Sequence, residues 1–95
     1  MFYSLPQFNS GGRHIINDKI GRFIIIEAQT AAEARRRAYE ITKDYMSYCP
    51  CCGERWDYDS LDDEGETFPN IWGEPINNRS ARVYYLDGRI EKHGD

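Results

Sequence analysis

Three consecutive isoleucines in the run Arg22–Ala28 constrain the fold more than any other feature of the 95-residue chain. Successive side chains of a strand point to opposite faces of a sheet, so an unbroken apolar run needs cover on both faces. We therefore expect a strand here that is buried on both sides. A domain of this size buries on the order of 65% of its unfolded surface, which is enough for one hydrophobic core. We expect a single domain over residues 1–95.

A helix is predicted directly after this strand. Thr30 and Glu33 have the spacing of a capping box, in which the Thr30 hydroxyl accepts from the amide of Glu33 and the carboxylate bonds back, so the helix should begin at Ala31. Pro50 and Gly53 should end it near Tyr48. Apolar residues recur at steps of three and four along one stripe that can pack on a sheet: Ala31, Ala34, Ala38, Ile41 and Tyr45.

Two further strand regions flank these elements. Residues 1–8 are β-prone, and Pro6 restricts them to the edge of a sheet because proline lacks a backbone donor. We expect the turn at 9–12 to lead into a short second strand over Arg13–Asn17. At the other end, Ala81–Leu86 and Arg89–His93 are expected to form a hairpin through a type I′ turn at residues 87–88.

The region between the helix and this hairpin shows no sustained periodicity over residues 57–78, which is typical of a long loop. The predicted fold class is therefore α+β, with a small antiparallel sheet, one main helix packed on it and a long central loop that is both acidic and aromatic. The loop and its flanks gather six aromatic residues that form either part of the core or a recognition surface: Tyr45, Tyr48, Trp56, Tyr58, Phe68 and Trp72.

The composition of the chain limits where the protein is expected to be located and what it is expected to bind. The longest apolar run, residues 23–26, is far shorter than a membrane span, and residues 1–6 lack the features of a signal peptide. Three cysteines within residues 49–52 are too close together and odd in number for a disulfide framework, so a reducing cytoplasm is expected. The net charge of -4 and pI near 5.1 disfavour nonspecific nucleic-acid binding.

The cysteine block supplies half of a metal site. Cys49 and Cys52 have the Cys-x-x-Cys spacing of a zinc knuckle, and Gly53 permits the tight turn that such a site needs. The two remaining ligands would have to come from His14, His93, Cys51 or a partner subunit. Small buried thiols in a tight turn are the favoured interpretation, so we expect no cofactor, with zinc as the alternative and a redox dithiol as the weakest option.

An acidic stretch within the loop is the first candidate for binding. It begins like a calcium loop, but it has no glycine at the sixth position, where such a loop needs one for its sharp turn, so an EF-hand is not expected. Asp62, Asp63 and Glu64 form either a solvated loop or an anionic surface for a basic host protein, with Trp72 as its aromatic anchor. The interface is predicted here.

Two arginines offer the alternative, an anion or nucleotide site. Arg13 follows the glycine turn, and Arg36 lies on the charged face of the predicted helix. Neither setting matches a phosphate-binding fingerprint. His14 and His93 are isolated in the sequence, and no nucleophile with an adjacent base and no paired carboxylates are apparent. We therefore expect a binding protein and not an enzyme.

Several of these segments together resemble a family of small uncharacterised proteins of tailed bacteriophages. They are Gln7 with the NSGG turn at 9–12, Ile25–Ala28 before the alanine-rich helix, CPCCGERW at 49–56 and YLDG at 85–88. The resemblance implies an accessory factor in the bacterial host cytoplasm that blocks a defence or replication protein, or sequesters a nucleotide signal. A zinc-knuckle nucleic-acid binder and a structural protein of the virion are the alternatives.

Overall fold

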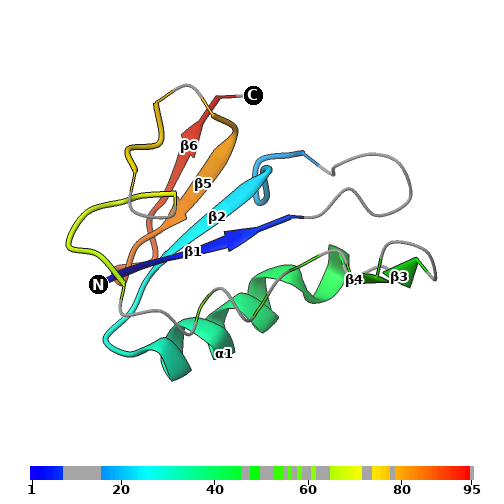
Figure 1. Ribbon diagram of the computed structural model, residues 1–95, viewed down its shortest axis with the longest axis horizontal. Helices are drawn as coiled ribbons and strands as arrows, with labels where there is room; N and C mark the ends of the chain where they lie inside the picture. Colours follow the sequence, from blue (N-terminus) through cyan, green and yellow to red (C-terminus); the bar gives the residue numbers. More distant parts are fainter. Residues whose placement is uncertain are drawn as a thin grey trace.

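The computed structural model describes residues 1–7, 16–45, 48–49, 53–54, 56, 58, 61, 65–71, 74–77 and 79–94. Its elements, in chain order, are β1 (Phe2–Pro6), β2 (Phe23–Glu27), α1 (Ala31–Thr42), the 3₁₀-helix η2 (Lys43–Tyr45), β3 (Tyr48–Cys49), β4 (Gly53–Glu54), β5 (Ala81–Tyr84) and β6 (Ile90–His93) (Figure 1). Among these residues, no helix is long and apolar enough to cross a membrane.

The main sheet has the strand order β1-β2-β5-β6. β1 pairs antiparallel with β2, and β5 pairs antiparallel with β6, but β2 and β5 run parallel. The α+β class with one main helix is confirmed, whereas the expectation of a purely antiparallel sheet is wrong. The reason is the connection between β2 and β5, which contains α1 and is long enough to return the chain to its starting end, as parallel pairing requires.

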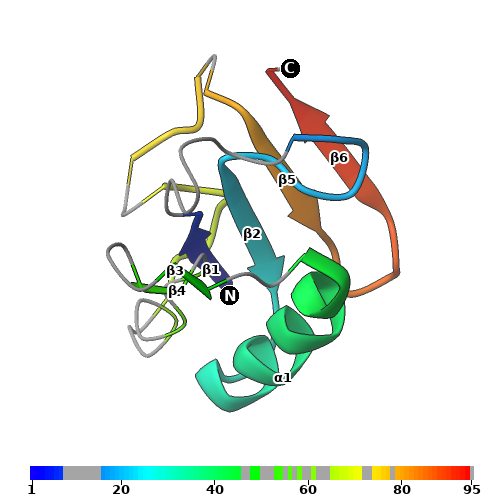
Figure 2. The same cartoon turned by 90° about the vertical axis from the view of Figure 1, so that its right-hand side faces the viewer.

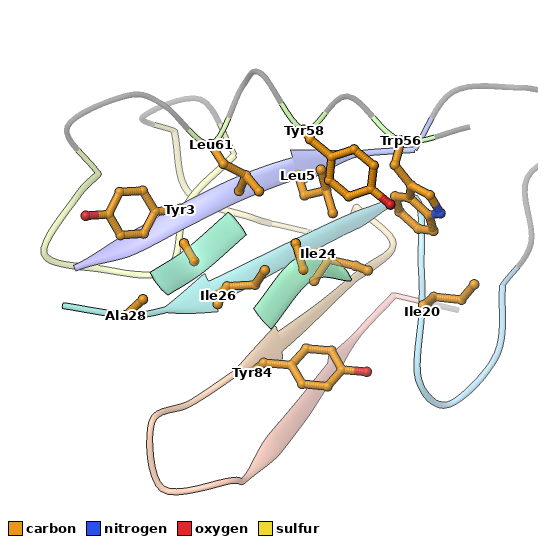
Figure 3. Close-up of a cluster of buried hydrophobic side chains, with 12 residues drawn as sticks. Tyr3, Leu5, Ile20, Ile24, Ile26, Ala28, Trp56, Tyr58, Leu61 and Tyr84 are labelled. Atoms are coloured by element: carbon orange, nitrogen blue, oxygen red, sulfur yellow. The ribbon is translucent and has the colours of Figure 1, made fainter. Parts of the chain in front are cut away.

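The isoleucine run forms the central strand β2, buried on both faces as predicted. Ile24 and Ile26 face α1, whereas Ile25 packs on the opposite side against Ile71 and Ile76, and all three isoleucines are fully buried. Figure 2 shows α1 on one side of the sheet and the segment before β5 on the other. The sheet is therefore covered by a helix on one face and by a loop on the other. Figure 3 labels ten members of the helix-side core: Tyr3, Leu5, Ile20, Ile24, Ile26, Ala28, Trp56, Tyr58, Leu61 and Tyr84.

The helix begins where the capping box predicts. The Thr30 hydroxyl accepts a hydrogen bond of 3.1 Å from the amide of Glu33. Ala34 and Ala38 are fully buried, which confirms the central part of the predicted stripe. The α-helical part ends at Thr42 and continues only as η2, earlier than the predicted end near Tyr48.

The strand predictions near the two chain ends hold with two corrections. β1 is an edge strand, but Ile16 and Asn17 of the expected second strand belong to no strand, and residues 13–15 lie outside the described residues. The β5–β6 hairpin is present, but its turn is not type I′, because Gly88 alone in it has a positive φ, of 93°. Gly88 donates to the carbonyl of Tyr85, which makes a type I turn followed by a left-handed glycine.

A buried arginine ties the hairpin to the loop before β2. Arg82 is fully buried. Its guanidinium donates to the carbonyls of Asn17, Ala81 and His93 at 2.8, 2.9 and 3.0 Å. Beside it, the hydroxyl of Tyr84 donates to the carbonyl of Lys19. The loop at residues 17–20 thus covers the part of the sheet beside α1, and it satisfies polar groups that would otherwise be costly to bury.

Candidate functional site

Most of the residues that the sequence singles out for binding lie outside the described residues. This applies to Asp62, Asp63, Glu64, Trp72, Arg13 and Cys52. The acidic triplet is bracketed by described positions, since Leu61 is fully buried and Glu66 exchanges two backbone hydrogen bonds with Phe2 of β1. Arg36 is described and lies exposed on α1. The prediction of an acidic interface therefore stays a prediction.

The first cysteine of the block lies in a short antiparallel strand pair. Cys49 of β3 pairs with Gly53 of β4, and Tyr48 pairs with Glu54. Cys49 therefore lies opposite the residue that follows Cys52 in the sequence, whereas residues 50–52 lie outside the described residues. The side chain of Cys49 is not described, and the described side chains contain no group of three His, Cys, Asp or Glu residues placed to hold a metal ion.

Part of the aromatic group belongs to the core. Trp56 and Tyr58 are buried, and the Tyr58 hydroxyl lies 2.7 Å from the Thr42 hydroxyl at the end of α1. The indole nitrogen of Trp56 is buried and has no hydrogen-bond partner among the residues that the structure describes. Phe68 is exposed, whereas Trp72 and the side chains of Tyr45 and Tyr48 lie outside the described residues. The recognition surface expected from these aromatics is thus reduced by the two that pack inside.

A different surface is formed where the N-terminus, the end of β2 and the β5–β6 turn meet at one end of the sheet (Figure 1). Met1 and Ala28 exchange hydrogen bonds of 3.0 and 2.9 Å, which fixes the first residue beside β2. The amide of Leu86 donates to the carboxylate of Glu27 at 3.0 Å and so holds the turn against the same strand. We call the surface made by Tyr85, Leu86 and Arg89 the hairpin-end surface.

Tyr85 is the centre of the hairpin-end surface. The guanidinium carbon of Arg89 lies 4.2 Å from the centroid of the Tyr85 ring. The ring of Phe2 packs edge-on against the Tyr85 ring, with 5.8 Å between the two ring centroids. Partial burial raises the pKa of the Tyr85 hydroxyl above its ordinary value, and the neighbouring carboxylate of Glu91 raises it further by a smaller amount. The positive charge of Arg89 lowers this pKa and so acts in the opposite direction. The phenol is therefore neutral at physiological pH, and its ring is fixed at this surface by Arg89 and Phe2.

The chemistry of the hairpin-end surface suits recognition. Leu86 is 47% exposed and directly follows the half-buried Tyr85, on whose ring the guanidinium of Arg89 is stacked. Tyrosine and arginine are enriched among residues that dominate binding energy, above all when packing fixes their conformations. Next to the surface, His93 and Glu91 form a pair at 2.6 Å, and both side chains are partly exposed.

Sequence reasoning missed Tyr85, Leu86 and Arg89 as functional candidates. The hairpin was predicted, but only as a structural element. A signal was present in the sequence, because Leu86 directly precedes the Asp-Gly turn, where an apolar side chain has nothing local to pack against.

Comparison with known proteins places the chain without assigning it an activity. A family model described as a domain of unknown function matches residues 1–95. Comparison with curated proteins and with solved structures finds no similar protein.

Proposed function

The chain belongs to the family DUF7296, and we propose that it acts as a non-enzymatic binding protein that docks onto another protein through its hairpin-end surface. The single observation that supports this proposal is the state of Tyr85, whose ring is fixed by contacts with Arg89 and Phe2 and is followed in the chain by the exposed Leu86. A fixed aromatic ring loses little conformational entropy on binding, so its contact area contributes fully to affinity. The exposed apolar side chain of Leu86 next to it would help to exclude water from the contact.

We propose a host protein as the partner, in the context of defence inhibition or host takeover. The resemblance to small proteins of tailed bacteriophages supports this context, and the bacterial cytoplasm is the location that we propose with it. The acidic residues Asp62, Asp63 and Glu64 would then accelerate association with a basic partner, since exposed charges act mainly on the rate of encounter. Sequestration of a nucleotide signal through Arg13 and Arg36 is the alternative role for the same context.

A zinc-knuckle nucleic-acid binder is the second candidate, because the pairing of β3 with β4 places Cys49 opposite Gly53. If zinc holds this hairpin, Cys49→Ser and Cys52→Ser should each release the metal and lower stability sharply, with Cys51→Ser nearly silent. Metal analysis of protein purified without chelators tests this candidate. Absence of stoichiometric zinc rules it out.

A pull-down from bacterial host lysate tests the proposed function. Tagged parent protein is compared with Leu86→Asp, which places a charge in the hairpin-end surface, and with Ile16→Asp as the matched control. Ile16 is 41% exposed on the loop before β2, so both substitutions put aspartate at an exposed apolar position. We expect a protein that the parent and Ile16→Asp capture and Leu86→Asp loses. Equal capture by all three places the interface elsewhere, and a nucleotide released by heating the purified parent supports the sequestering role instead.

A further inference from the structure

The two edges of the four-stranded sheet differ in how the chain closes them. At the outer edge of β1, Phe2 donates to the carbonyl of Glu66 at 2.7 Å and accepts from its amide at 3.0 Å. Gln7, just after β1, forms a further bridge with Trp56. At the opposite edge, in the part of the chain that the structure describes, no segment pairs with the outer side of β6.

The hydrogen-bonding pattern shows which residues of β6 turn outward. The amide of Tyr85 donates to the carbonyl of Arg89 at 2.9 Å, so the backbone of Arg89 faces β5. Because backbone groups alternate in direction along an antiparallel pair, Glu91 and His93 also face β5, whereas Ile90 and Lys92 turn their N–H and C=O groups away from it. An outward row of this kind is a template for another strand.

The charges of β6 select one way to pair two copies of it. In a two-fold antiparallel pair, one residue must lie opposite its own copy. Centring the pair on Arg89, Glu91 or Lys92 places like charges opposite each other, which is destabilising. Centring it on Ile90 places an exposed isoleucine against its copy and sets Arg89 of each chain opposite Glu91 of the other.

The Ile90-centred register also satisfies the backbone. Ile90 turns its N–H and C=O outward, so two copies exchange a pair of hydrogen bonds there. Arg89 and Glu91 then occupy the flanking positions without backbone bonds, where opposite side chains approach most closely. Both residues lie on the face of the sheet away from α1, since Glu91 pairs with Val83, and their side chains are accessible.

We propose that β6 is a self-association edge, at which two copies of the chain pair antiparallel about Ile90 and are held by two reciprocal Arg89–Glu91 contacts. The sheet of one copy then continues into the sheet of the other, and both copies of α1 lie on the same face of the joined sheet. The left-handed Gly88 ends the strand on one side of the contact, so the paired segment is short. The association is therefore weak and depends on protein concentration.

Sedimentation velocity over a concentration series tests this proposal with charge exchanges. Arg89→Glu alone and Glu91→Arg alone each bring like charges together twice, and each should weaken self-association by roughly ten-fold or more. An equimolar mixture of the two variants restores opposite charges at both contacts, so it should associate as the parent does and as one-to-one heterodimers. Lys92→Glu is the matched control, because Lys92 lies opposite only the turn glycine in this register and its substitution should leave association unchanged.

Each outcome of the series decides the proposal. Circular dichroism and melting curves confirm that the exposed substitutions keep the fold. A parent protein that remains monomeric at the highest concentration overturns the proposal, and so does a mixture that associates no better than its two components. Sensitivity to Lys92→Glu equal to that of the other two variants would mean a different register. The inference goes beyond the proposed function and does not depend on it, since self-association is measured on purified protein without lysate.

Discussion

The contact between the end of α1 and the central loop leads to a quantitative prediction. The hydroxyl of Thr42 donates to the carbonyl of Ala38 at 2.8 Å and lies 2.7 Å from the hydroxyl of Tyr58. Thr42 is fully buried and Tyr58 is 6% exposed, so water cannot replace either partner. This pair attaches the loop, for which the sequence shows no periodicity, to the last turn of the helix.

Thr42→Val removes one hydroxyl at constant shape and leaves the Tyr58 hydroxyl buried without this partner, which should cost about 2 kcal/mol of unfolding free energy. Tyr58→Phe should cost about 1 kcal/mol, because the Thr42 hydroxyl keeps its bond to the helix. The double variant has no orphaned hydroxyl from this pair, so it should lose about 2 kcal/mol in total, which gives a coupling of roughly 1 kcal/mol.

Urea unfolding of the parent, the two single variants and the double variant measures this coupling. Tyr39→Phe is the matched control. The ring of Tyr39 packs on that of Tyr58 with 4.4 Å between the ring centroids, but Tyr39 itself is 44% exposed. This substitution should cost little and show no coupling to Thr42→Val. Effects of Thr42→Val and Tyr58→Phe that simply add would refute the hydroxyl pair and, with it, this placement of the loop.

Three further predictions concern stability. Thr30→Ala should cost about 1 kcal/mol by chemical denaturation, because the first turn of α1 loses its cap, and Thr30→Ser should restore most of it. Gly88→Ala should cost about 1 kcal/mol for its left-handed backbone alone, since nothing lies within 4 Å of the added carbon. Gly65→Ala should cost clearly more in the same assay, because its added carbon would also meet the Tyr3 ring at 2.9 Å; equal losses would contradict this packing. Arg82→Ala should lower the free energy of unfolding by about 3 kcal/mol or more, since it removes the hydrogen bonds to Asn17, Ala81 and His93 together with a buried side chain. A loss below about 1 kcal/mol would contradict this role of Arg82.

Local signals in the sequence predicted local structure well. The isoleucine run identified β2, the capping box identified the start of α1, and Pro6 identified an edge strand. Each of these signals acts within a few residues, through side-chain alternation, a first-turn hydrogen bond or a missing donor. The β5–β6 hairpin was found by its Asp-Gly pair, although the same pair also serves a three-residue turn.

Features that depend on distant contacts could not be predicted in the same way. The parallel pairing of β2 and β5 depends on how a long connection returns to the sheet. The burial of Arg82 depends on a loop 65 residues away in sequence, whose carbonyl at Asn17 accepts from the guanidinium. The hairpin-end surface likewise requires Met1, Glu27 and Leu86 to lie at one end of the sheet, and no short-range pattern in the sequence indicates that they do.

The most direct test of binding through the hairpin-end surface is the affinity of the captured partner protein for three purified variants, measured by isothermal titration calorimetry. The proposal predicts that Leu86→Asp weakens binding by roughly ten-fold or more, as expected at the centre of an interface, while Ile16→Asp binds as the parent does. The triple alanine variant of Asp62, Asp63 and Glu64 should bind more weakly only at low salt, because exposed charges are screened as ionic strength rises. Unchanged binding by Leu86→Asp, together with a large and salt-independent loss in the triple variant, would contradict the hairpin-end surface and place the interface on the acidic loop.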